Sequence, residues 1–128
     1  VMSTLSSAIT DERMLNDPNV VKVVSNQRGE AIYFSRSPIP FDREQINSKI
    51  KFNGLYQRHI GIYGYRAKFL QQFSQWNACA MEKTEFLEQL RVLWHGEKIQ
   101  IAEAVVIPAE GIDTEDDLLR LRTLLSPS

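Results

Sequence analysis

The chain has 128 residues, the size of a single domain, and 43% of them are hydrophobic, which is enough for a packed core and unlike a disordered composition. Its 15 basic and 16 acidic residues leave a net charge of −1, which argues against a general electrostatic nucleic-acid binder. The single cysteine, Cys79, excludes an internal disulfide and a cysteine-rich metal site, and no apolar run reaches the ~20 residues of a membrane span.

The chain opens with a predicted strand and a short helix. Residues 1–9 mix apolar and small hydroxyl side chains, and because a protein rarely begins inside a strand, we expect a fragment, a processed chain or an expressed domain. Thr10 is the predicted N-cap of a helix with Asp11 and Glu12 in its first turn. The Asn-Asp-Pro-Asn run at 16–19 ends that helix.

A hairpin is predicted next. Residues 20–24 and 30–34 are rich in β-branched and aromatic side chains, and the SNQRG run at 25–29 has the composition of a turn. The SRSPIP segment at 35–40 contains two prolines, which hold it extended and fix the position of Arg36. That guanidinium could form a surface ion pair or could clamp a carboxylate or phosphate.

The polar residues 41–57 predict a long loop, and RHIGIYGYR at 58–66 predicts a central strand. In an extended strand His59 and Tyr63 share one face, about 13 Å apart, so a polar molecule of sugar size could lie across them. The opposite face is aliphatic and suits a core. An alternative interpretation is a buried strand whose His and Tyr side chains bond to the backbone.

Two amphipathic helices are predicted after this strand. Residues 66–76 carry aromatic and leucine side chains at helical spacing, and residues 81–95 form the clearest helix, which Gly96 should end. Glu88 and Gln89 flank the apolar stripe of the second helix. They are either solvated flanks or, if the helix borders the polar face of the central strand, walls of a pocket.

In the last part of the chain, the spacing of apolar residues predicts a strand at 98–107 and a helix at 115–125. Thr114 and Asp117 resemble a capping box at the start of that helix. Asp113 lies just before the cap, and on its own the pattern gives it the role of capping or orienting the helix.

Five motifs occur in the order and spacing of one known family. They are DPNVVKVV (17–24), YFSRSPIP (33–40), RHIGIYGYR (58–66), LEQLRVLWHGEKI (87–99) and GIDTEDDLLRLR (111–122). The chain thereby resembles the C-terminal half of the 3-deoxy-manno-octulosonate cytidylyltransferases, also called CMP-Kdo synthetases. The resemblance runs from about residue 5 to residue 125 and is weakest in the loop at 42–57.

The resemblance implies a bacterial cytoplasmic enzyme of lipopolysaccharide synthesis. Such a nucleotidyltransferase transfers CMP from CTP to the acidic sugar Kdo and releases pyrophosphate, with Mg2+ as cofactor and a homodimer as the working form. The implied fold is α/β: the C-terminal part of a nucleotidyltransferase-type, Rossmann-like mixed sheet flanked by helices, with a dimerisation hairpin. Neither a nucleic acid nor a membrane is an implied partner.

The family resemblance also assigns site residues. Those implied to contact Kdo are Arg36, His59, Tyr63, Glu88 and Gln89. Asp113 is implied as the catalytic residue that binds magnesium. The residue types suit these roles, because a guanidinium pairs with a sugar carboxylate, a Glu–Gln pair offers acceptors and a donor to hydroxyls, and Mg2+ prefers carboxylate oxygen.

One departure from the family is large. The basic loop that holds the CTP phosphates and a second metal-binding aspartate belong to the family's N-terminal half, and these 128 residues contain neither. We therefore expect a single domain, 1–128, that is the acceptor-sugar and dimerisation half and is inactive alone. It should expose an apolar surface where the other half docks. The alternatives are a non-catalytic sugar-acid-binding or dimerisation module and a related acid-sugar cytidylyltransferase, such as one for sialic acid.

Overall fold

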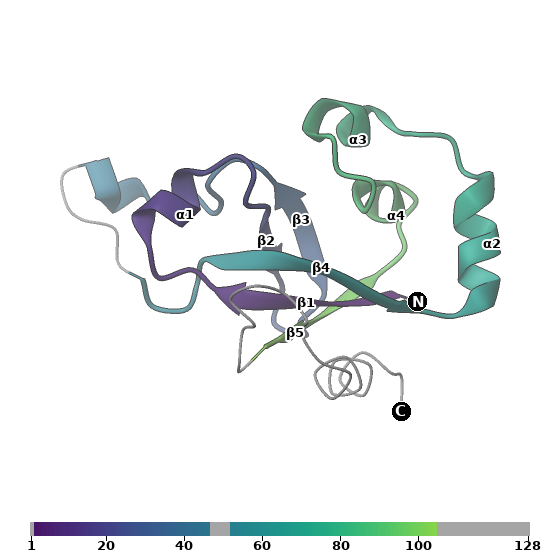
Figure 1. Cartoon of the computed structure of the whole chain (residues 1–128), viewed down its shortest axis with the longest axis horizontal. Coiled ribbons are helices and arrows are strands. Elements are labelled where there is room, and N and C mark those ends of the chain that lie inside the picture. Colours follow the sequence, from purple (N-terminus) through teal and green to yellow (C-terminus); the bar gives the residue numbers. More distant parts are fainter. Residues whose placement is uncertain (1, 47–51, 105–128) are drawn as a thin grey trace.

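The computed structural model describes residues 2–46 and 52–104, and it contains a five-stranded sheet in the order β3-β2-β4-β1-β5 (Figure 1). The strands are β1 Met2–Ala8, β2 Lys22–Ser25, β3 Ala31–Ser35, β4 Gln57–Tyr65 and β5 Ile99–Glu103. β5 runs parallel to β1, and the other neighbours are antiparallel. The mixed sheet confirms the predicted α/β fold, and β4 is the central strand.

The helices are short. They are α1 Glu12–Asn16, a 3-10 turn Arg43–Ile46, α2 Ala67–Gln75, α3 Ala80–Glu85 and α4 Leu90–Trp94. α2, α3 and α4 gather at one end of the sheet, whereas α1 lies toward the other end (Figure 1). The prediction that Thr10 caps α1 is wrong by one residue, because the Asp11 carboxylate accepts the Arg13 backbone N–H at 2.8 Å.

The prediction of one continuous helix over 81–95 is wrong. Phe86 adopts a left-handed conformation, with φ 57°, and separates α3 from α4. Arg36 donates from Nε to the Glu85 carbonyl at 2.7 Å and from Nη2 to the Phe86 carbonyl at 3.2 Å. These bonds satisfy backbone acceptors that a helix end leaves unpaired, so a residue about fifty positions earlier stabilises the break.

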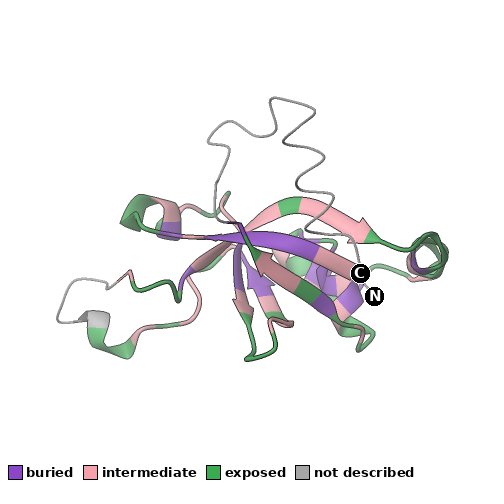
Figure 2. Cartoon of the chain, turned by 90° about the horizontal axis from the view of Figure 1, so that it is seen from below, coloured by how far each residue is buried: buried purple, intermediate pink, exposed green. Residues whose placement is uncertain are grey.

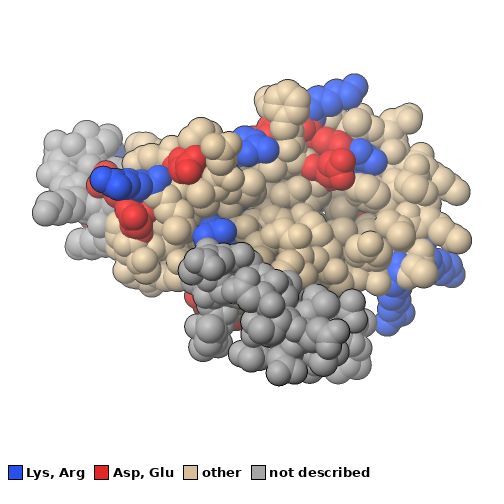
Figure 3. Space-filling view, viewed as in Figure 1, with Lys and Arg blue, Asp and Glu red and all other residues tan. Residues whose placement is uncertain are grey.

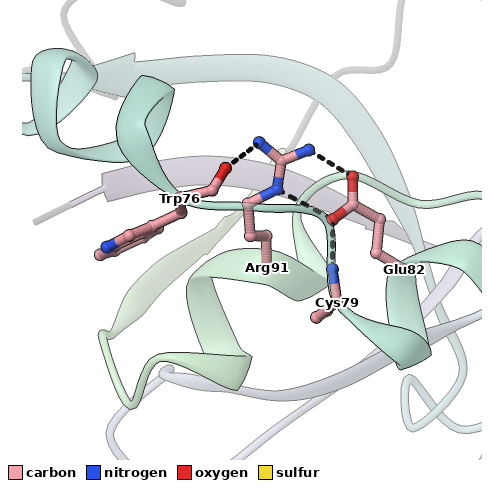
Figure 4. A network of polar contacts seen from close by, with 4 residues as sticks. All are labelled: Trp76, Cys79, Glu82 and Arg91. Atoms are coloured by element: carbon pink, nitrogen blue, oxygen red, sulfur yellow. Dashed lines mark hydrogen bonds and ion pairs between the residues drawn. The ribbon is translucent and has the colours of Figure 1, made fainter.

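An ion pair holds the two short helices together (Figure 4). Arg91 donates from Nη2 and Nε to the Glu82 carboxylate at 2.5 and 2.8 Å, and Glu82 also accepts the Cys79 backbone N–H at 3.2 Å. The Arg91 guanidinium lies 4.6 Å from the centre of the Phe73 ring of α2. In one straight helix residues 82 and 91 would be about 13 Å apart along the axis, so this ion pair requires the break.

The main core lies between the sheet and α2–α4. Its buried members are Val23, Phe34, Phe69, Leu87, Leu90, Val92 and Ile99. On the opposite face of β4, Leu5 packs with Ile60, Ile62 and Ala102 in a second, smaller cluster. Figure 2 shows the buried residues concentrated in the strands, with the outer sides of helices and loops exposed. The larger core is therefore on the face that carries His59 and Tyr63, and the predicted aliphatic face contributes the smaller one.

The turns agree with the sequence interpretation. Gly29 and Gly96 both have φ 78°, a conformation that L side chains rarely adopt. At Gly29 a Cβ would also lie 2.8 Å from the Gln100 side-chain nitrogen and 3.2 Å from the Ile101 carbonyl oxygen, so the Gln100 side chain would have to move. Gly96 donates its N–H to the Leu93 carbonyl at 2.9 Å and ends α4 as predicted.

Surface charge is scattered on the face shown in Figure 3, where Lys and Arg side chains stand singly or beside acidic ones. No described helix is long and apolar enough to cross a membrane. The predicted helix at 115–125, Asp113 and the end of the strand predicted at 98–107 lie outside the described residues.

Candidate functional site: an aromatic pocket beside a bulged strand

A bulge in β4 shapes the site. Thr4 of β1 pairs with Tyr63, but the next residue, Leu5, pairs with Ile60, so β4 has two more residues than β1 at this point. The Thr4 hydroxyl lies 2.7 Å from the Ile62 carbonyl oxygen and 3.1 Å from that of Ile60. It therefore bonds directly to the backbone of the bulged segment.

The bulged strand places its two predicted site residues next to each other. The ring centroids of His59 and Tyr63 are 5.3 Å apart, so the expectation of two groups about 13 Å apart is wrong for the side chains. The distance of 13 Å holds for a straight extended strand, whereas β4 is bulged between these two residues and their rings are in contact, with an angle of 54° between the ring planes. They act as one aromatic wall rather than as two ends of a binding face.

His59 is held by side chains rather than by the backbone partners of the alternative interpretation. Its Nε2 lies 2.9 Å from the Thr4 hydroxyl, and its Nδ1 lies 3.5 Å from the Gln89 amide nitrogen. The imidazole and the Phe34 ring pack in a T-shaped arrangement, with centroids 4.9 Å apart. Burial lowers the pKa of His59 to about 4, so the imidazole is neutral near pH 7.

A cavity of about 400 Å³ opens beside this wall. It is lined by Met2, Tyr63, Tyr65, Phe69, Leu70, Phe73, Phe86, Leu87, Glu88 and Gln89. The residues come from the ends of β1 and β4, from α2, and from the segment between α3 and α4. Three of the predicted residues, Tyr63, Glu88 and Gln89, therefore share one pocket.

The polar groups of the pocket are few and differ in character. Burial, and then the negative charge of Glu88, raises the pKa of Tyr63, so the phenol stays protonated and can donate as well as accept. Glu88 is exposed and Gln89 is 9% exposed. A mostly aromatic and aliphatic cavity with a phenol, a carboxylate and an amide suits a polyol, which stacks its C–H faces and exchanges hydroxyl bonds.

The break between α3 and α4 brings Glu88 and Gln89 into the pocket. Both residues belong to the segment after the left-handed Phe86 and before Leu90, where α4 begins. The sequence interpretation that they become pocket walls holds, although the continuous helix that it assumed does not exist.

Arg36 stands apart from the pocket lining. Its side chain bonds to three backbone carbonyls, those of Pro18 at 3.0 Å, Glu85 at 2.7 Å and Phe86 at 3.2 Å. A guanidinium has five N–H donors, so these three bonds leave two for another acceptor. Through Phe86, Arg36 adjoins the wall of the pocket, and its predicted contact with a sugar carboxylate stays a prediction.

Sequence reasoning missed several lining residues. Met2 and the aromatic residues of α2 line the cavity, and Thr4 supports it from behind. The sequence patterns around these residues indicated core packing only. Strand pairing and helix packing decide that the ends of β1, β4 and α2 lie together. Asp113 lies outside the described residues, and within 2–46 and 52–104 no group of three His, Cys, Asp or Glu side chains could hold a metal.

A comparison with known protein families identifies the family of this chain. The sequence profile of the cytidylyltransferase family matches residues 1–99. This chain belongs to the cytidylyltransferase family.

Curated cytidylyltransferases resemble nearly the whole chain. A 3-deoxy-manno-octulosonate cytidylyltransferase of Idiomarina loihiensis is 52% identical over 126 residues, which cover 96% of this chain and 50% of the relative. The enzyme of the same name from Aeromonas hydrophila is 51% identical, over 98% of this chain and 50% of the relative. The chain thus spans about half the length of the curated cytidylyltransferases it matches.

A solved cytidylyltransferase has the same fold. The structure of CMP:2-keto-3-deoxy-manno-octonic acid synthetase in complex with CTP matches with a TM-score of 0.73 and 40% sequence identity. The match covers 96% of this chain and 48% of the solved one. The predicted nucleotidyltransferase-type sheet is therefore confirmed.

Proposed function

We propose that this chain is the acceptor-sugar part of an enzyme that transfers CMP from CTP to Kdo and releases pyrophosphate. The observation that carries the proposal is identity of about half the residues, along almost the entire chain, to enzymes named for this reaction. The CTP complex of the solved relative and the polyol-sized pocket support it. The lipopolysaccharide pathway, the cytoplasm and a homodimer that includes the β2–β3 hairpin belong to the same proposal.

In this proposal the pocket binds and orients Kdo. Tyr63 and Gln89 exchange hydrogen bonds with sugar hydroxyls, Glu88 accepts from others, and neutral His59 supports both from the aromatic wall. The two free donors of Arg36 face the sugar carboxylate. Holding the sugar in one orientation lets its anomeric hydroxyl attack the α-phosphorus in line, so positioning is the contribution of these residues.

Mg2+ would neutralise charge on the triphosphate of such an enzyme. Glu88 is the one carboxylate among the described lining residues, and a single exposed carboxylate does not make a Mg2+ site. The described residues therefore do not fit the ion, and we derive no step through it. Asp113 stays the predicted ligand, and the CTP-binding residues are expected in the part of the relatives that this chain does not span.

The first test is the intact mass of the purified chain, combined with a pyrophosphate-release assay with CTP, Kdo and Mg2+. We expect no release of pyrophosphate from the 128-residue chain and release from the complete enzyme.

In the complete enzyme Gln89→Ala and Glu88→Ala should raise the KM for Kdo about tenfold or more, since each removes a hydrogen bond to the sugar. Lys83→Ala, an exposed change on α3, serves as control. A complete enzyme without activity on Kdo would contradict the proposal and favour the non-catalytic module.

A further inference from the structure

The Thr4 hydroxyl has three polar neighbours and only one proton. The Ile62 and Ile60 carbonyl oxygens lie at 2.7 and 3.1 Å, and His59 Nε2 lies at 2.9 Å. Thr4 is fully buried. Two oxygens 2.7 Å apart need a proton between them, and a carbonyl has none, so Thr4 donates to the backbone. His59 Nε2 must then be the donor to the Thr4 oxygen.

This direction of bonding determines the other ring nitrogen. A neutral imidazole has one N–H, so when Nε2 carries the proton, Nδ1 offers a lone pair. The Gln89 amide nitrogen lies 3.5 Å from Nδ1 and is the donor for it. No described residue donates a hydrogen bond to the side-chain carbonyl oxygen of Gln89, Oε1, and Gln89 lines the cavity.

We propose that Thr4 is a positioning residue, whose hydroxyl fixes His59 as the Nε2–H tautomer and thereby turns the Gln89 carbonyl oxygen toward the ligand. The pocket then offers an acceptor at this point and selects a ligand that presents a hydroxyl there. The identity of that ligand as a sugar rests on the proposed function, whereas the tautomer is a property of the unliganded chain.

The opposite tautomer would reverse the polarity of the pocket. With the proton on Nδ1, the Nε2 lone pair would face the Thr4 oxygen lone pairs, and Gln89 would have to turn its carbonyl toward the ring. Its NH2 group would then face the cavity and would favour an acceptor such as a carboxylate. Thr4, which does not line the cavity, therefore decides whether the Gln89 side chain presents an acceptor or a donor to the ligand.

The tautomer can be measured by NMR on the chain with 15N-labelled histidine. The chain has two histidines, and His95→Gln assigns the signals of His59. At pH 7 we expect a protonated Nε2 and an unprotonated Nδ1 in the wild type and in Thr4→Ser, which retains the hydroxyl. Thr4→Val should give a substantial Nδ1–H population. Thr84→Val, the same change at an exposed site, should not. A dominant Nδ1–H form in the wild type would overturn the proposal.

A second variant keeps the test decisive if Thr4→Val does not fold. Gln89→Glu places a carboxylate opposite Nδ1, so His59 should bind a second proton with about tenfold or higher affinity, measured as a rise of its NMR titration midpoint. An unchanged titration would show that Gln89 does not contact Nδ1. The pyrophosphate assay on the complete enzyme tests the proposed function separately. The proposed function and the proposed His59 tautomer can therefore be contradicted independently of each other.

Discussion

At the scale of single residues, His59 shows how burial changes chemistry. Its neighbours are the phenol of Tyr63, the amide of Gln89, the hydroxyl of Thr4 and the ring of Phe34, and none of them carries a charge. Desolvation is the cause of its low pKa, since no anion compensates a proton on the ring. The residue is therefore a neutral hydrogen-bonding group rather than a proton donor near pH 7.

The stability of the chain should depend on pH through His59. Its pKa is about 4 in the folded chain and 6.5 in the unfolded reference, so the unfolded state binds more protons between these values. As the pH falls from 6.5 to 4, the free energy of unfolding should decrease by up to about 3 kcal/mol from this group. Urea unfolding at pH 7 and pH 4.5 measures the loss. It should shrink in His59→Gln but not in His95→Gln, and equal losses in all three would contradict the prediction.

Phe86 has a strained backbone conformation that the packing of its side chain does not explain. It is 81% exposed and left-handed, a conformation that is unfavourable for an aromatic side chain. Phe86→Asn should therefore raise the free energy of unfolding by about 0.5–1 kcal/mol, because Asn tolerates this conformation better. Urea unfolding tests the change, with Leu70→Asn as an exposed apolar control of normal backbone. A loss of stability in Phe86→Asn would show that the exposed ring stabilises the fold.

At the scale of elements, the break between α3 and α4 organises the site. Three sets of contacts surround it: the Arg36 bonds to the end of α3, the bonds that the Glu85 carboxylate accepts from Tyr33, Ser35 and the Arg36 backbone, and the Glu82–Arg91 pair. The segment of residues 86–89 that lines the cavity exists because the helix stops there.

Arg36 should therefore contribute to stability whether or not it binds a ligand. Arg36→Lys retains the charge but cannot reach three carbonyls in the fork geometry of a guanidinium, and we expect a loss of about 1–3 kcal/mol in urea unfolding. Arg66→Lys, at an exposed position, should change stability by less than about 0.5 kcal/mol. Equal, small effects of the two changes would mean that Arg36 does not hold the end of α3.

At the scale of the whole molecule, several large apolar side chains lie on the surface. The chain spans about half the length of its relatives, and Phe41, Phe86, Ile32, Leu55 and Trp94 are each more than half exposed. β3 and β5 are the last strands at the two ends of the described sheet. An isolated bridge between Glu30 and Gln100, with the Ile101 N–H donating to the Gly29 carbonyl at 2.7 Å, covers part of the outer side of β5, whereas β3 keeps a side without a strand partner. Exposed apolar side chains and open edges favour association with another polypeptide.

The isolated chain should therefore self-associate. Size-exclusion chromatography with light scattering should show a mass that rises with protein concentration, and Ile32→Lys on the edge strand β3 should reduce the rise. Gln72→Lys, which adds one charge at an exposed position on α2, serves as the control for added charge. A clean monomer at every concentration would contradict this prediction.

The sequence alone determined the elements with strong local signals. β-Branched and aromatic residues identified the strands, glycines indicated the turn of the hairpin and the end of α4, and motif order predicted the nucleotidyltransferase-type sheet that the structural comparison confirms. Only the tertiary structure decided the bulge in β4, the break after Glu85 and the cavity. The reason is physical, because local propensity acts between neighbours in the chain, whereas Thr4 reaches β4 and Arg36 reaches the end of α3 only after folding has brought distant segments together.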